Sequence, residues 1–395
     1  MAYRADKPAP DIGFQGEGIL AVAHQDGGEA IVWSAPDPRE DVPSIRASLR
    51  RGSLVVSADG PVSEQRFPTL DVQGALAKVA DGLAQRVGAA SRRSLPPAWC
   101  SWYQYGEHVT AAHVLRASEE ARSLDLPLEI VQVDDGYQLE VGEWLRPCPD
   151  FGQGIAELVA TLRESGRTVG LWCAPLVAPE HGELLGKHPD WAVAETDAGV
   201  AWGRRLLALD VTHPGVAEYL DRTFRTMSSW GVSYWKLDFL YGGALAGQRS
   251  DDESPLAAYR RAIRLIREAV GEEASLVGCG APILPSLGLF DAMRIGPDID
   301  LGYTPRDDDI TMPSQLGAAN AVRARAFQHG RFWTNDPDCL LLRPQMDRRQ
   351  EWAQLVGNSR GLRCLGDAPD RLDSWGLEAA RRLLQPSIPA VADPG

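Results

Sequence analysis

The sequence predicts an α/β protein in which a (β/α)8 barrel follows a small, reduced N-terminal β domain. Short alternating runs separated by turn residues fill the chain up to about residue 90, and this is typical of an all-β unit. From Ala98 onward, strands and helices alternate about eight times over roughly 290 residues, close to the usual size of such a barrel. A doubly wound sheet is the rival architecture, but no GxGxxG or GxxxxGK[ST] motif stands at a strand–helix turn.

The N-terminal part contains four short strand candidates and one amphipathic helix. The strands are expected at residues 18–23, 30–33, 44–49 and 54–57, and the helix at 72–87. The polar and then proline-rich segment 92–97 is typical of a boundary between domains. We therefore expect an N-terminal β-rich domain with a linking helix at residues 1–95 and a catalytic barrel at residues 96–388.

The barrel strands are mostly apolar, as expected of a parallel sheet that is covered on both faces. We expect strands at residues 98–103, 128–133, 168–173, 234–239, 275–279, 293–296, 332–334 and 362–365. Helices are expected at residues 110–124, 155–165, 214–230, 256–270, 313–328, 346–358 and 375–384.

Composition limits the classes of partner. The net charge of −14 argues against a nucleic-acid or anionic-membrane partner, and no apolar run is long enough to span a bilayer. The six cysteines include no CxxC pair, and the seven histidines show no HExxH spacing, so we expect neither a disulfide framework nor a metal. We interpret the cysteines as reduced core or pocket residues of a cytoplasmic protein without a cofactor.

The stretch Tyr234–Phe239 carries a lysine and an aspartate in an otherwise apolar and aromatic strand. Asp238 lies near the end of this strand, and Lys236, two residues earlier, falls on the same face. A cation there would keep Asp238 ionised, which suits a nucleophile. A structural ion pair at a strand terminus is an equally good interpretation from these residues alone.

Polar and aromatic residues recur at the ends of the other predicted strands. Such ends converge on one face of a barrel, where carboxylates and tryptophans together suit a sugar. Each has a structural alternative, because aspartates also favour turns, tryptophans also fill cores, and an arginine can simply pair with a neighbouring acid. For the loop aspartates 336 and 338 the structural alternative is the favoured one. The residues are Trp99, Asp134, Asp135, Trp172, Cys279, Gly280, Arg294, Asp298, Asp336 and Asp338.

From about residue 96 to 385 the chain resembles the α-galactosidases of glycoside hydrolase families 36 and 27, with family 36 the closer match. The segments that carry the resemblance are WKLD at 235–238, DDGY at 134–137, GLW at 170–172, ALDVTHP at 208–214 and RIGPDID at 294–300. Family members usually carry a larger N-terminal β-sandwich and a C-terminal β domain. Residues 1–95 would then be a reduced sandwich.

The resemblance implies a role for each matching residue. Asp238 would be the nucleophile and Asp298 the general acid/base. Asp134 and Asp135 would hold the galactose 4- and 6-hydroxyls, Lys236 would contact ring hydroxyls, and Arg294 would lie near the 2-hydroxyl. Trp99 and Trp172 would line the pocket, with Cys279 and Gly280 beside the sugar's 2-position.

These roles imply a retaining hydrolase that cleaves terminal α-galactosides through a covalent glycosyl-enzyme, without a cofactor. The resemblance leaves a homo-oligomer open. Two alternatives keep the same carboxylates, namely cleavage of α-N-acetylgalactosaminides and transfer of galactose to a sugar acceptor. An alternative of another class is a catalytically silent carbohydrate-binding barrel, although a protein that only binds has no need for two opposed carboxylates.

Overall fold

The N-terminal part of the chain folds into two three-stranded antiparallel sheets and one helix. The computed structural model describes residues 12–24, 28–88, 95–152 and 154–385. One sheet has the order β1-β4-β5 and the other the order β2-β3-β6. Their strands are β1 (Phe14–Glu17), β2 (Ile19–His24), β3 (Glu29–Ser34), β4 (Ser44–Arg50), β5 (Ser53–Ala58) and β6 (Ser63–Phe67). The predicted strands are therefore present, and β1 and β6 are additional.

Helix α1 (Val72–Val87) has the bounds that the sequence predicts. The Asp71 side chain accepts a hydrogen bond from the N–H of Gly74 at its start, and Gly88 ends it with a left-handed φ of 64°. Its apolar face is buried, and its residues belong to the same continuous hydrophobic core as those of the barrel. The predicted boundary segment includes residues 92–94, which lie outside the described residues.

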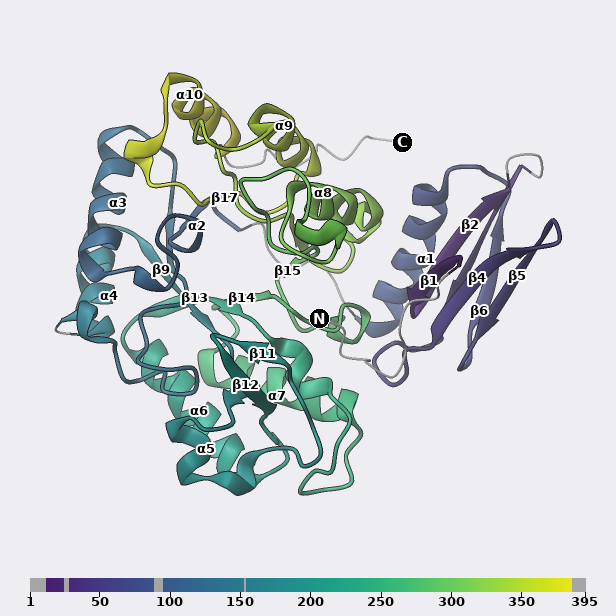
Figure 1. Cartoon of the computed structure of the whole chain (residues 1–395), viewed down its shortest axis with the longest axis horizontal. Helices are drawn as coiled ribbons and strands as arrows, with labels where there is room; N and C mark the ends of the chain where they lie inside the picture. Colours follow the sequence, from purple (N-terminus) through teal and green to yellow (C-terminus); the bar gives the residue numbers. More distant parts are fainter. Residues whose placement is uncertain (1–11, 25–27, 89–94, 153, 386–395) are drawn as a thin grey trace.

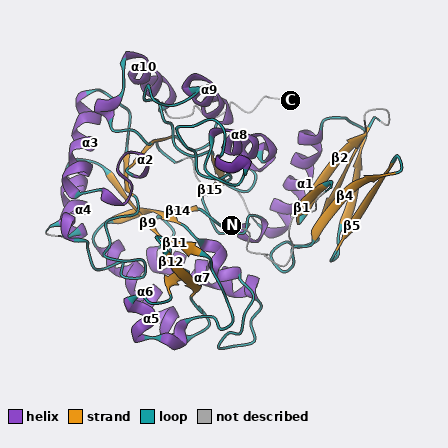
Figure 2. Cartoon of the chain, in the orientation of Figure 1, coloured by secondary structure: helices purple, strands orange, loops and turns teal. Residues whose placement is uncertain are grey.

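Eight parallel strands form the barrel, with helices around them (Figures 1 and 2). They are β7 (Ala98–Cys100), β8 (Ile130–Val133), β9 (Thr168–Cys173), β13 (Val232–Leu237), β14 (Ser275–Gly278), β15 (Ala292–Arg294), β16 (Thr334–Asp336) and β17 (Cys364–Leu365). Neighbours in space follow the chain order, and β17 returns beside β7. The ring is joined at its last seam by a hydrogen bond from the N–H of Leu362 to the carbonyl of Asn335. The predicted (β/α)8 class is confirmed.

The helices agree with the predicted ones to within a few residues at each end. They are α3 (Ala111–Ser123), α4 (Ile155–Glu164), α6 (Pro214–Ser229), α7 (Pro255–Val270), α8 (Gln315–Ala324), α9 (Arg349–Ser359) and α10 (Ser374–Leu383). The first strand is shorter than predicted, because the chain turns at Ser101 into the short helix α2 (Trp102–Tyr105).

β9 is followed by a small antiparallel sheet, here called the excursion, which the sequence analysis did not predict. It consists of β10 (Val177–Pro179), β11 (Val200–Ala201) and β12 (Arg204–Ala208), paired in the order β10-β12-β11. The turn between β11 and β12 carries Trp202 with a φ of 53°. These strands are too short for alternation of polar and apolar residues to identify them.

The fifth barrel strand, β14, is followed by the 3₁₀ turn η5 (Leu284–Ser286) in place of a full helix. The N-terminal part packs at this position. A Cβ atom added to Gly18 would lie 2.9 Å from Leu284 Cδ1. Gln73 donates to the carbonyl of Arg323, and Arg331 pairs with Asp81 at 2.8 Å. In Figure 1, α1 correspondingly lies between the β-sheets and α8.

Among the described residues, none of the helices combines the length and the apolar character that a bilayer crossing requires.

Candidate active site

Asp238 directly follows the fourth barrel strand, β13. Its backbone N–H donates to the carbonyl of Cys173 at 2.8 Å, so the residue is fixed to the neighbouring strand β9. Its Oδ2 accepts a hydrogen bond from Trp172 Nε1 at 3.1 Å, and its Oδ1 accepts one from the N–H of Phe239 at 2.7 Å. Phe239 has a left-handed φ of 52°, which turns the chain away from the strand at this point. Two donors therefore orient the carboxylate at the mouth of the barrel.

Lys236 does not make the predicted contact with Asp238. Its Nζ lies 2.9 Å from Asp134 Oδ2, and both side chains are buried. Lys236 is inside the strand, whereas Asp238 is beyond the last strand residue, so the two-residue spacing no longer places them side by side. Desolvation is the largest single influence and lowers the pKa of Lys236, but the nearby charges, foremost the carboxylate of Asp134, together raise this pKa well above its usual value.

Asp134 accepts hydrogen bonds from four donors. Its Oδ2 accepts from Gln132 Nε2 at 2.6 Å, from Cys100 Sγ at 3.3 Å and from Lys236, and its Oδ1 accepts from the N–H of Asp135 at 3.0 Å. Three of the four donors meet Oδ2, so Oδ1 keeps a lone pair for a further donor. Burial acts to raise the pKa of Asp134, whereas Lys236 acts in the opposite sense. With four donors around it, the ionised pair is the form that the geometry favours.

Asp135 has fewer partners than Asp134. Gln138 Nε2 donates to Oδ1 at 2.5 Å and Trp202 Nε1 donates to Oδ2 at 2.7 Å. Burial is the main cause that raises the pKa of this carboxyl group. The Trp202 ring also packs against Trp172 and Phe239, with ring centroids 6.1 Å and 4.9 Å away. Trp202 thus links the second-strand aspartate to the surroundings of Asp238.

Arg294 joins the sixth and seventh strands through three carboxylates. Its Nη1 donates to Asp298 Oδ1 at 2.7 Å, its Nη2 donates to Asp338 Oδ1 at 2.6 Å, and its Nε lies 3.4 Å from Asp336 Oδ2. The Arg294 side chain is 4% exposed, whereas that of Asp298 is 45% exposed. A buried cation therefore holds an accessible carboxylate in place.

Asp338 is the most enclosed member of this group. Its Oδ2 accepts hydrogen bonds from the Tyr103 hydroxyl and from the N–H of Ile299, and its own N–H donates to Asp336 Oδ1. Burial is the main cause that raises the pKa of Asp338 to about 6. Desolvation, with the charges of Asp298 and Asp338, raises the pKa of Tyr103 well above its usual value, so its hydroxyl remains a donor.

Asp238 and Asp298 line one cleft of about 670 Å³ at the carboxyl ends of the strands. Cys279, Gly280 and Arg294 line the same cleft. Gly280 has a φ of 54°, and a Cβ atom added to it would lie 3.0 Å from Asp238 Oδ1. A side chain at this position would therefore press on the carboxylate. Burial raises the pKa of the Cys279 thiol well above its usual value, so this wall of the cleft is uncharged.

Comparison with known proteins links this geometry to a family. Residues 101–259 match the Melibiase family model. TtGalA, the α-galactosidase of Thermus thermophilus, whose structure was solved with p-nitrophenyl α-D-galactopyranoside, is 29% identical. Its TM-score is 0.79, and the match covers 94% of this chain and 76% of that one. The chain is therefore similar to α-galactosidases over most of its length.

Two curated relatives are similar to the chain over shorter segments. The α-galactosidase AgaA of Geobacillus stearothermophilus is 29% identical over 122 residues, which is 29% of this chain and 17% of AgaA. The bifunctional α-galactosidase/sucrose kinase AgaSK of Mediterraneibacter gnavus is 25% identical over 162 residues, which is 38% of this chain and 17% of AgaSK. The aligned segments thus span about a sixth of either relative.

The family-36 motifs do not place every predicted residue at the cleft. Trp99 is 1% exposed, its Nε1 donates to the carbonyl of Asp367 at 2.9 Å, and it is absent from the residues that line the cleft. Trp172 contacts Asp238 as described above. Asp336, which ends β16, and Asp338, which lies just beyond it, hold Arg294 beside Asp298, and for both a structural role was favoured. In the sequence, the indication of a role at the site was that both aspartates come at the end of a predicted strand, as other site residues do.

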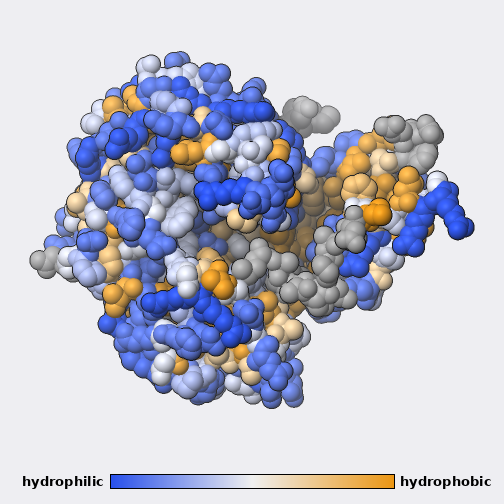
Figure 3. Space-filling view, viewed as in Figure 1, coloured by the Kyte–Doolittle hydropathy of each residue, from blue (hydrophilic) through white to orange (hydrophobic). Residues whose placement is uncertain are grey.

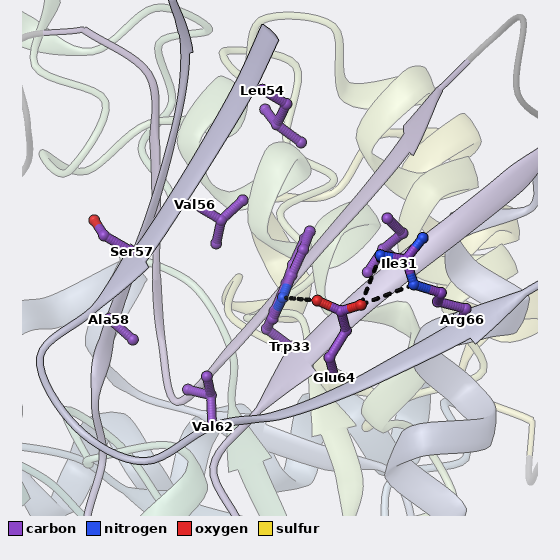
Figure 4. Close-up of a pocket in the computed structure, with 9 residues that line it drawn as sticks. All are labelled: Ile31, Trp33, Leu54, Val56, Ser57, Ala58, Val62, Glu64 and Arg66. Atoms are coloured by element: carbon purple, nitrogen blue, oxygen red, sulfur yellow. Dashed lines mark hydrogen bonds and ion pairs between the residues drawn. The ribbon is translucent and has the colours of Figure 1, made fainter.

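A second hollow, of about 360 Å³, lies in the N-terminal part, far from these carboxylates (Figure 4). It opens between β3, β5 and β6 and is lined mainly by apolar side chains. Its one carboxylate, Glu64, accepts a hydrogen bond from Trp33 Nε1 at 2.9 Å and forms an ion pair with Arg66 at 2.8 Å. We therefore assign the chemistry to the barrel cleft.

Proposed function

We propose that this protein is a retaining glycoside hydrolase that cleaves terminal α-galactosides, with Asp238 as nucleophile and Asp298 as general acid/base. The observation that carries the proposal is that these two carboxylates, which follow the fourth and sixth strands, line one cleft. The similarity to TtGalA, which was solved in complex with p-nitrophenyl α-D-galactopyranoside and with stachyose, supports the choice of sugar.

In the proposed reaction the Asp238 carboxylate attacks the anomeric carbon, and the bond from that carbon to the leaving oxygen breaks. The hydrogen bonds from Trp172 and Phe239 orient the carboxylate for attack. Asp298 gives its proton to the leaving oxygen, which departs as a neutral alcohol. Asp298 then takes a proton from water as that water displaces Asp238, so the sugar configuration is retained.

The buried groups of the second strand would bind the sugar's hydroxyls. Asp135 is bonded to two donors and so keeps acceptor sites for hydroxyl groups. Asp134 keeps one acceptor site, on Oδ1, while its Oδ2 fixes the ammonium group of Lys236. We therefore propose that Asp135 and Lys236 are the main polar contacts of the sugar on this side, with Trp202 covering the ring's C–H face.

The test is hydrolysis of p-nitrophenyl α-D-galactopyranoside by the wild type, Asp238→Ala and Asp298→Ala, each with and without azide. We expect wild-type turnover and near-complete loss in both variants. Azide should rescue Asp238→Ala to give the β-galactosyl azide, because azide attacks from the face that the nucleophile vacated. It should rescue Asp298→Ala to give the α-galactosyl azide, because azide then opens the covalent intermediate.

Asp370→Ala is the matched control, because Asp370 pairs with Arg116 on the surface and should leave turnover unchanged. A wild type that binds galactose without turning over the substrate would favour the silent carbohydrate-binding barrel. An α-azide from Asp238→Ala would contradict the assignment of the nucleophile.

One observation favours a second substrate. Cys279, Gly280 and Ala281 form a run of small residues along the cleft beside Asp238, which leaves room for an acetamido group at the sugar's 2-position. Activity on p-nitrophenyl α-N-acetylgalactosaminide, measured beside the galactoside, distinguishes the two substrates. We also infer a cytoplasmic location, supported by six cysteines that are all free thiols.

A further inference from the structure

Three cysteines that are far apart in the sequence meet inside the barrel, outside the residues that the proposed reaction uses. Cys100 ends β7, Cys364 begins β17, and Cys339 lies in the segment that follows β16. Their Sγ atoms all lie within 4.8 Å of one another, and all three residues are buried. We refer to them as the thiol triad. Spacing along the sequence could not reveal it, because it depends on the first, seventh and eighth strands meeting where the barrel closes.

We propose that the thiol triad is a binding site for one soft, thiophilic metal ion, and that this ion is Cu(I). Thiolates are the ligands that soft ions such as Cu(I) select. Structural zinc sites take four ligands, but the triad supplies three, with no fourth histidine, cysteine or carboxylate atom grouped with it in the part of the chain that the structure describes. Asp134 is not part of this group, and the Oδ2 atom that faces Cys100 also accepts hydrogen bonds from Gln132 and Lys236.

The backbone around the triad holds the three sulfur atoms in place. Cys364 accepts a hydrogen bond at its carbonyl from the N–H of Leu340, the residue after Cys339, at 2.6 Å. The carbonyl of Cys339 accepts one from Trp352 Nε1 at 2.9 Å. Cys100 lies in the ladder between β7 and β8. Ligands carried by strands and by bonded segments need little reordering when an ion binds.

Ion binding at the triad would reach the sugar side of the barrel through Cys100. Its Sγ donates to Asp134 Oδ2, and this carboxylate holds Lys236. Each thiol that binds the ion releases its proton to the solvent, and no electron is transferred because the ion enters as Cu(I). Loss of the S–H donor frees one acceptor site on Asp134 and places thiolate charge near Lys236. We therefore expect a loaded protein to handle galactosides less well than the unloaded one.

The test is an anaerobic titration of the full chain with Cu(I), supplied as its acetonitrile complex, against a chromophoric Cu(I) chelator. We expect one ion per chain, with X-ray absorption showing three sulfur neighbours. The variants Cys100→Ser, Cys339→Ser and Cys364→Ser should each weaken binding by at least roughly 100-fold, the upper end of what the loss of an outer partner costs at a metal site. Cys148→Ser is the control, because Cys148 is half-buried and outside the triad, and its binding should equal that of the wild type.

The proposal is overturned if the wild type takes no ion from the chelator, or if X-ray absorption shows fewer than three sulfur neighbours. It is equally overturned if a triad variant that keeps the wild-type melting curve binds as tightly as the wild type. The sulfur count needs only the wild type, so it decides even where a serine variant fails to fold. Binding is measured without a sugar, so its failure is distinct from a failure of the proposed hydrolysis.

Discussion

Asp338 is the residue on which the sixth- and seventh-strand side of the cleft depends. It contacts Tyr103, Arg294 and the backbone of Ile299, and it has a φ of 89°, a left-handed conformation that is rare outside glycine. Arg294 in turn holds Asp298. A residue that does not line the cleft therefore determines how a residue of the cleft is presented.

Asp338→Asn should lower kcat for p-nitrophenyl α-galactoside by roughly 10–100-fold with little change in KM, because a small misplacement of a reacting group can cost about 100-fold in rate. The expected cause is that Arg294 loses a charged partner and shifts relative to Asp298. Asp336→Asn is the comparison, because Asp336 lies 3.4 Å from Arg294 Nε and should have a smaller effect. Equal kcat values for Asp338→Asn and wild type would contradict this dependence.

The pH dependence of stability should also report on Asp338. Its pKa is about 6 in the folded chain, against 3.8 for an ordinary aspartate. Between these values the folded state binds more protons than the unfolded state, so this carboxyl group destabilises the fold as the pH rises from about 4 to 6. The effect is on the order of 3 kcal/mol.

The melting temperature of Asp338→Asn minus that of the wild type should therefore shift in favour of the variant between pH 4 and pH 7. Asp370→Asn, measured in the same way, controls for the loss of an exposed carboxylate. A difference that stays constant, or shifts in favour of the wild type, would show that Asp338 does not titrate in this range.

At the scale of elements, the excursion β10-β12-β11 adds a small antiparallel sheet to the loops at the mouth of the barrel. It carries Trp202 at a turn and places its indole N–H on Asp135. β12 pairs antiparallel with β10 on one side and with β11 on the other, and this pairing fixes the position of the turn. The excursion therefore places Trp202 beside Asp135, and these two residues line a hollow of about 410 Å³.

Trp202→Phe should raise KM for the galactoside by about tenfold, because a hydrogen bond to a charged group contributes roughly 1.5–3 kcal/mol. The phenyl ring would keep the contact with Phe239, so kcat should change less than KM. Val200→Ala on the same hairpin is the control, since Val200 is 67% exposed. Steady-state kinetics on the three proteins decide the question, and an unchanged KM would limit Trp202 to a packing role.

Elements with a strong local sequence pattern could be predicted from the sequence. Contacts between strands that meet only when the barrel closes could not. Helix α1 carries its own cap at Asp71, and β8 is apolar except for Gln132, so both were visible in the sequence. The Lys236–Asp134 pair joins strands that are distant in the chain, and the two-residue spacing pointed to Asp238 instead. Trp202 was missed because its strands are only two and five residues long.

At the scale of the whole molecule, the two parts of the chain share one hydrophobic core. The N-terminal part packs beside η5, where a full helix would otherwise follow β14. Figure 3 shows that apolar side chains also gather on the outer side of this part. The large apolar residues exposed there include Phe14, Leu49, Leu54 and Val55.

Leu284→Ala should lower the free energy of unfolding by about 2–5 kcal/mol, the usual cost of truncating a buried leucine. Leu284 is 3% exposed and lies against Gly18 of the N-terminal part. Leu115→Ala is the control, because Leu115 is 37% exposed and should cost much less. Thermal melting of both variants measures the difference. Equal melting temperatures would show that the contact at η5 adds nothing to stability.

The packing of the N-terminal part beside η5, where a helix would otherwise follow β14, has a consequence for the order in which parts of the chain can fold. Domains generally fold as they leave the ribosome, beginning with the N-terminal one. The β-sheets and α1 are complete in the nascent chain before residues 284–286 are synthesised, so the surface that will contact Leu284 is present before η5 itself. The newly made turn can then pack directly against an existing partner, and the side chain of Leu284 need not wait exposed to the solvent.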